Sequence, residues 1–66
     1  MTTNTQTAWA IVQGPEAMPS YLCGFAAWSL DPERALRFPN RDAADVFAQG
    51  FLTDPSGVRY EERVFR

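Results

Sequence analysis

The chain has 66 residues, a formal net charge of −2, six arginines, no lysine, no histidine and one cysteine. This composition excludes a disulfide within the chain and removes the histidines and cysteine pairs from which zinc sites are normally built. With 45% apolar residues, among them five Phe, two Trp and two Tyr, the chain is too apolar to be intrinsically disordered, and we expect it to fold.

The start of the chain shows no sign of a targeting segment. Residues 1–7 carry no positive charge, and no apolar run behind them is long enough for a signal peptide or for the roughly 20 residues of a membrane span. We expect residues 1–6 to form a disordered tail and residues 7–66 to form a single domain. The lone cysteine fits a reducing compartment, so the predicted location is the cytoplasm.

Two strands are predicted in the first part of the chain. Residues 7–13 are β-branched and aromatic, and Gly14 with Pro15 ends this first strand. Residues 14–20 hold two prolines and a glycine, which is typical of a loop. Residues 21–27 predict a second strand that is apolar on both faces. The short connection favours antiparallel pairing of the two.

A helical region follows the predicted strands. Asp31 before Pro32 indicates an N-cap and a first helical position, so residues 32–37 are expected to form a single turn or a short helix. Pro39 ends it, because the residue before a proline avoids the α region. Asn40 then predicts a second N-cap, with the main helix starting immediately after it.

The main helix is expected to pack on the sheet through one apolar stripe. The stripe has the i, i+3, i+4, i+7 spacing of a helical face and consists of Ala44, Phe47, Ala48 and Phe51. Gly50 lies where a left-handed C-terminal cap would occur. The alternative is a helix that continues to Leu52.

The last strand is predicted over residues 58–65, after a turn at residues 54–57. Val58 and Tyr60 would face inward, and Glu62 interrupts this alternation, which predicts an edge position or a bulge. The predicted fold is therefore α+β, a three-stranded, mostly antiparallel sheet with ββαβ connectivity. A right-handed crossover gives the strand order 2-1-3, with one helix on one face and the other face open.

The side chains that carry out catalysis are scarce. Asp42 and Asp45 resemble an acid–base pair, but carboxylates in the first turns of a helix are favoured by its dipole, which is the more economical interpretation. Cys23 has no histidine or lysine to activate it, and the four glycines never cluster into a phosphate-binding loop. We expect no catalytic residue, no metal and no cofactor, and hence no enzyme.

Two surface features remain as candidates for binding. Arg59 and Arg63 lie on one side of the last strand, but Glu61 lies between them, so ion pairs across strands are favoured over contact with phosphates. Trp9 and Trp28 either fill the small core or form an apolar patch on the open sheet face, and such patches mark partner surfaces.

Residues 28–48 combine the end of a hairpin, an Ala-x-x-Phe segment and a capped, alanine-rich helix. This segment resembles a pattern in small orphan proteins of bacteria and phages. In size, acidity and mixture of strand and helix, the chain is also similar to the anti-CRISPR proteins of phages and mobile elements. That resemblance implies an inhibitor that binds and blocks a host effector complex, and it implies no role for any single residue.

The predicted function is a small, acidic, non-catalytic protein-binding module, acting as an inhibitor from a phage or mobile element. Its partner would be a protein complex with a basic surface, and no membrane contact is expected. The predicted partner-binding residues are Trp28, Asp42, Asp45, Asp54, Glu61 and Glu62. One alternative is a structural or regulatory homodimer that buries its open sheet face. A weaker alternative is nucleic-acid binding through Arg34, Arg37, Arg41, Arg59 and Arg63.

Overall fold

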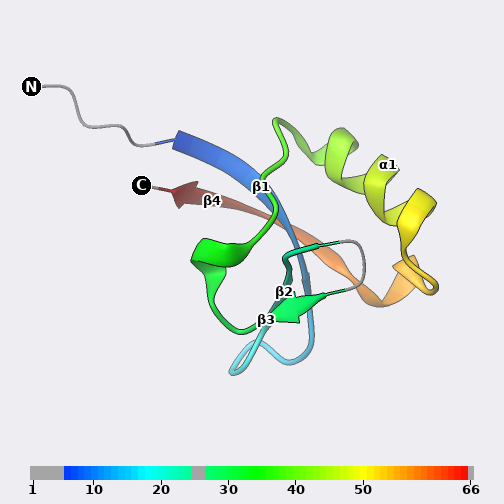
Figure 1. Ribbon diagram of the computed structural model, residues 1–66, viewed down its shortest axis with the longest axis horizontal. Helices are drawn as coiled ribbons and strands as arrows, with labels where there is room; N and C mark the ends of the chain where they lie inside the picture. Colours follow the sequence, from blue (N-terminus) through cyan, green and yellow to red (C-terminus); the bar gives the residue numbers. More distant parts are fainter. Residues whose placement is uncertain (1–5, 25–26, 66) are drawn as a thin grey trace, which may run out of the picture.

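The computed structural model describes residues 6–24 and 27–65 (Figure 1). In chain order its elements are β1 (Gln6–Gln13), β2 (Ser20–Leu22), β3 (Trp28–Ser29), the 3-10 turn η1 (Pro32–Arg34), α1 (Arg41–Phe51), the 3-10 turn η2 (Pro55–Gly57) and β4 (Arg59–Phe65). The fold is α+β with an antiparallel sheet, as predicted. The predicted tail lies outside the described residues, except that Gln6 begins β1.

The sheet has four strands in the order β3-β2-β1-β4, so the prediction of three strands is wrong. The segment predicted as one strand, residues 21–27, splits after Leu22, because the chain turns back to pair Leu22 with Trp28. The amide of Cys23 donates to the carbonyl of Ala27 over 2.8 Å and closes this turn. An unbroken apolar run does not reveal such a reversal, since both halves remain apolar.

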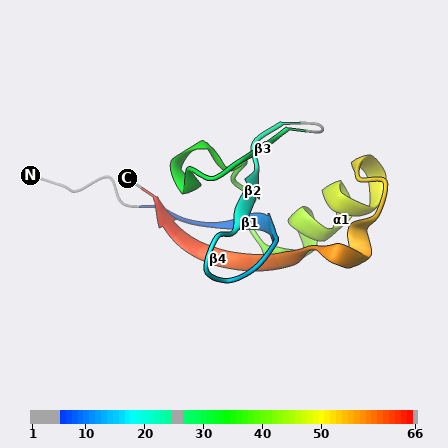
Figure 2. The same ribbon diagram turned by 90° about the horizontal axis from the view of Figure 1, so that it is seen from below.

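The last strand lies beside the first, as predicted, and it is an edge strand. β1 and β4 pair without interruption from Gln6 opposite Phe65 to Val12 opposite Arg59. The predicted alternative of a bulge near Glu62 is therefore wrong. β2 meets only the end of β1, at Val12 and Gln13, and Figure 2 shows β2 rising steeply from the β1–β4 pair. The sheet is thus strongly bent.

β1 is buried on both faces, which corrects the expectation of an open sheet face. Ala10, Ile11 and Val12 have no exposed surface, although successive side chains of a strand point to opposite faces. Ile11 packs with Leu22, Ala44 and Ala48 on the helix side. The opposite side holds a second cluster, formed by Ala8, Ala10, Val12, Tyr21, Ala35 and Phe65.

The chain between β3 and α1 covers this second cluster. Ala35, directly after η1, belongs to it, and the amide of Leu36 donates to the carbonyl of Leu22 over 2.9 Å. Phe38 then pairs with Trp9 on the edge of β1 that β2 leaves uncovered, through N–H···O bonds of 2.8 and 2.9 Å. The predicted homodimer required an open apolar sheet face, and both faces of β1 are covered by other parts of the chain.

Both predicted N-caps are present. The side chain of Asn40 accepts a hydrogen bond from the amide of Ala43 over 2.8 Å, and Asp31 accepts one from the amide of Glu33 over 3.0 Å. The predicted glycine cap is wrong, because α1 continues through Gly50 without a positive φ. Its C-cap is Leu52, in extended conformation, which agrees with the predicted alternative.

Candidate functional site

The acidic residues of α1 have different environments. Asp42 is exposed in the first turn of the helix, where its charge complements the helix dipole. Asp45 is half-buried and accepts a hydrogen bond of 2.8 Å from the hydroxyl of Tyr60 on β4. Asp45 therefore ties the helix to the sheet.

Tyr60 is the one group in the described residues with a clearly displaced pKa. Burial raises the pKa of its hydroxyl above the usual 10.0, and the hydrogen bond to Asp45 and the charge of that carboxylate raise it further. The guanidinium of Arg41, whose Cζ lies 5.1 Å from the centre of the Tyr60 ring, opposes the increase. The contact links α1 to β4 through one hydrogen bond.

The other predicted acids do not form one surface. Asp54 caps η2 by accepting bonds from the amide and hydroxyl of Ser56, over 3.3 and 2.5 Å. Glu61 pairs with Arg59 over 3.0 Å. Glu62 points to the opposite face of β4 from Glu61, is exposed, and makes no ion pair or hydrogen bond with any described residue.

Besides Arg41, three more arginines make contacts within the molecule. Arg59 donates to the carbonyl of Gly14 over 2.7 Å as well as pairing with Glu61. Arg63 stacks on the ring of Tyr21, with its Cζ 5.2 Å from the ring centre. Arg37 lies in the same way over Phe65 at 4.3 Å. Arg63 and Arg37 thus lie over two rings of the second apolar cluster, and these contacts favour a structural role over binding phosphates.

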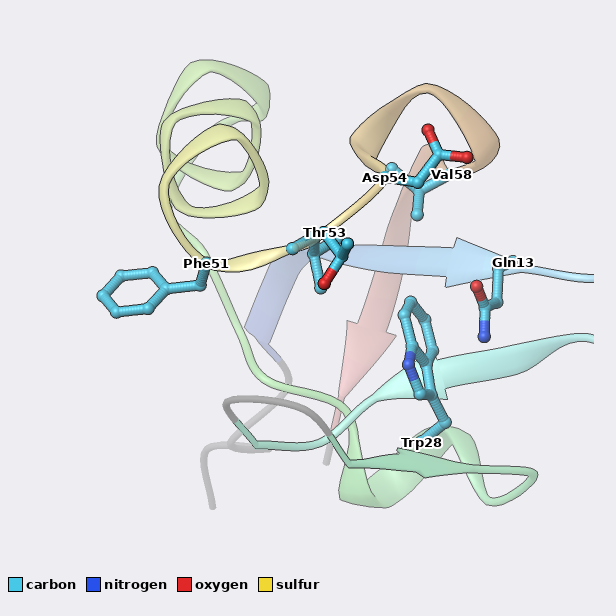
Figure 3. A pocket seen from close by; sticks show the side chains of 7 residues that line it. Gln13, Trp28, Phe51, Thr53, Asp54 and Val58 are labelled. Atoms are coloured by element: carbon cyan, nitrogen blue, oxygen red, sulfur yellow. The ribbon is translucent and has the colours of Figure 1, made fainter.

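Trp28 and Asp54 are the two predicted residues that the fold brings into one cavity. They line a hollow of about 220 Å³ between β3, the end of α1 and the chain around η2, together with Gln13, Phe51, Leu52, Thr53 and Val58. Figure 3 shows the indole of Trp28 standing toward Gln13 and Thr53. Trp9 and Trp28 are both half-buried and pack against the helix-side cluster.

Sequence reasoning missed a row of three aromatic rings that runs from Phe38, before α1, to Phe47 and Phe51 on the helix. The ring centres of Phe38 and Phe47 are 5.3 Å apart, and those of Phe47 and Phe51 are 4.6 Å apart. Phe51 was expected to face the sheet, but 55% of it is exposed, and Figure 3 shows its ring pointing away from the hollow. The i, i+4 spacing of Phe47 and Phe51 was the available signal.

Within residues 6–24 and 27–65, no three Cys, Asp or Glu side chains come together as a metal site. No helix among these residues has the length and apolar character needed to cross a bilayer. Cys23 is half-buried and free.

Comparison with known proteins finds no matching family, no matching curated protein and no matching solved structure. The resemblance to anti-CRISPR proteins stays a prediction.

Proposed function

We propose that this chain is a non-catalytic protein-binding module that binds a basic side chain of its partner in the hollow lined by Trp28. The observation that carries the proposal is the meeting of Trp28 and Asp54, which lie far apart in sequence, on the wall of one cavity. An aromatic ring and a carboxylate on the walls of one hollow can together hold an arginine or lysine side chain, by cation–π attraction and by charge.

The walls of the hollow suit the stem of such a side chain. Leu52 and Val58 are apolar and half-buried, and they line the same hollow as the indole. The Oδ1 atom of Asp54 takes both bonds from Ser56, which leaves Oδ2 for a cation. Arginine fits best, because its planar guanidinium stacks on rings and forks onto carboxylates.

An exposed apolar residue at the hollow extends the contact surface. Phe51 borders the hollow with its ring turned outward, and 55% of this residue is exposed. Interfaces concentrate their binding energy in a few such aromatic anchors, with polar groups around them. A net charge of −2 would steer the molecule toward a basic partner.

This mode of binding agrees with the resemblance to phage and mobile-element inhibitors. Such a protein works in the cytoplasm by covering a basic surface that a host complex needs, and it needs no catalytic group. Asp42, Asp45, Glu61 and Glu62 would then act through overall charge, while Asp54 makes the direct contact.

The test is an NMR titration with a short peptide that contains arginine, in parallel with a peptide in which neutral citrulline replaces it. The indole N–H signal of Trp28 should shift with the arginine peptide and much less with the citrulline peptide. Raising the salt concentration should weaken the binding. Equal shifts with both peptides, or none, contradict the proposal.

Variants at the rim show whether the hollow itself is the site. Asp54→Asn keeps the N-cap, because Asn caps as well as Asp, and should weaken binding about fivefold or more. Asp42→Asn removes the same charge at the exposed start of α1 and should change affinity by less than twofold. Thr53→Arg should block the hollow without disturbing the core, since Thr53 is exposed. Equal effects of the two Asp variants would mean that only net charge matters.

A further inference from the structure

β4 presents an unpaired backbone edge. It is the last strand in the order β3-β2-β1-β4, and one of its edges pairs with β1 at seven consecutive positions. No described residue forms a backbone ladder with its other edge. A strand edge of this length is a template on which another strand can pair.

The charges on β4 follow an order that matters for pairing. Arg59, Glu61 and Arg63 alternate in sign along one face, while Glu62 and Val64 lie on the opposite face. Charged residues on an edge strand ordinarily prevent pairing. Here the signs make pairing depend on register, because residues directly opposite each other across two strands come within about 5 Å.

Among the antiparallel registers in which at least five residues of each β4 overlap, one sets opposite charges face to face. With Glu62 on the two-fold axis, all seven residues overlap, Glu61 of each copy faces Arg63 of the other, and Tyr60 faces Val64. Moving the axis to residue 61 sets Arg59 against Arg63 and Glu61 against itself. Moving it to residue 63 sets two arginines face to face. Both of those registers oppose like charges without a compensating pair.

We infer that two copies of this chain associate through β4 in the register centred on Glu62, which joins their sheets into one. The two cross-strand pairs of Glu61 with Arg63 set the register, in addition to the contacts of Glu61 with Arg59 and of Arg63 with Tyr21 within each copy. The two Glu62 side chains repel each other on the axis, where nothing in the described structure neutralises them, so the dimer is reversible and weak. This interface is separate from the hollow beside Trp28.

The first test uses the fact that a residue on a two-fold axis meets its own copy. Sedimentation equilibrium of the wild-type protein should show a reversible dimer at concentrations up to about 1 mM. Glu62→Gln should tighten it about threefold or more. An equimolar mixture of wild type and Glu62→Arg should form a heterodimer tighter than either homodimer, because Glu then faces Arg. Glu62 is exposed, so these changes leave the fold intact.

The second test fixes the register. Glu61→Arg and Arg63→Glu should each weaken the dimer tenfold or more, and a mixture of the two variants should restore it, since both cross-strand pairs are then opposite in sign. Glu16→Arg, in the exposed β1–β2 loop, is the matched control and should have no effect. A wild-type protein that stays monomeric, or a Glu62→Arg mixture that associates no better than its parts, overturns the inference.

Discussion

The contact between Tyr60 and Asp45 is the polar link between helix and sheet. The hydroxyl of Tyr60 donates to the carboxylate of Asp45 over 2.8 Å, and both residues are half-buried. This bond makes Asp45 less available to a partner than an exposed acid would be. Asp45 was predicted to bind a partner because it is one of the acids that would meet a basic surface. Its actual partner, Tyr60, lies fifteen positions later on another element, and sequence spacing does not reveal this contact.

Removing the hydroxyl should therefore cost stability in a pH-dependent way. Tyr60→Phe should lower the free energy of unfolding by about 1 kcal/mol near neutral pH, as expected for one lost hydrogen bond. Because the pKa of Tyr60 is raised in the folded protein, the unfolded chain loses this proton first as the pH rises past 10.0, and the folded state then loses stability.

Urea denaturation at pH 8 and at pH 11 measures this. The stability advantage of the wild type over Tyr60→Phe should be present at pH 8 and should shrink at pH 11. An advantage that is the same at both pH values would show that the tyrosine is not held in its neutral form.

Gly14 is the described residue with a positive φ, at 89°, in the turn that leaves β1. Gly14→Ala should destabilise the protein by about 1 kcal/mol, because a side chain is strained in that conformation even though space is available. Gly57→Ala is the control, since an added Cβ there meets nothing within 4 Å and φ is not positive. Thermal denaturation of the two variants compares them, and equal melting temperatures would contradict the prediction.

At the scale of elements, α1 contains a glycine that the helix does not need. Gly50→Ala should raise the free energy of unfolding by roughly 0.5–1 kcal/mol, since alanine favours the helix and an added Cβ meets nothing within 4 Å. Circular dichroism during thermal unfolding measures the change. A loss of stability would mean that Gly50 adopts the left-handed cap conformation that the sequence alone predicted.

The elements that were predicted correctly are those fixed by neighbours in sequence. Asn40 and Asp31 cap their turns by binding amides two or three residues ahead, so their types and positions suffice to find them. β3 was missed because its formation depends on the pairing of Trp28 with Leu22. The glycine cap was wrong because the chain after Gly50 stays with the helix: Leu52 packs against the helix-side cluster, and its amide donates to the carbonyl of Ala48 over 3.0 Å.

The whole molecule depends on β1, which contributes to both apolar clusters. A domain of this length has a stability of roughly 3–10 kcal/mol. Ile11→Val should cost about 0.5–1.5 kcal/mol and Ile11→Ala about 2–5 kcal/mol, enough to leave the latter partly unfolded. Val46→Ala, at an exposed helix position, should change stability by less than about 0.5 kcal/mol. Urea denaturation checks all three, and a tolerated Ile11→Ala would mean that this core is not what holds the fold together.

The candidate site also depends on the whole fold. The sequence therefore predicted Trp28 and Asp54 as separate binding residues and did not predict that they line one hollow. Trp28 was chosen as an exposed aromatic and Asp54 as an acid. Their meeting depends on β3 and on the path of the chain after Phe51, neither of which local patterns predict. Conversely, Glu61 and Glu62 are adjacent in sequence, yet the alternation of β4 sends them to opposite faces.

The pairing of β1 with β4 also sets the timing of folding on the ribosome. β1 leaves the exit tunnel early, but its seven-residue partner is synthesised some fifty positions later. At translation rates of about 5–20 residues per second, β4 is synthesised roughly 3–10 s after Ile11 and Val12, and these side chains stay without their β4 partners during that time. During that interval the nascent chain offers an apolar segment to chaperones and to other nascent chains, and slowing translation would lengthen this exposure.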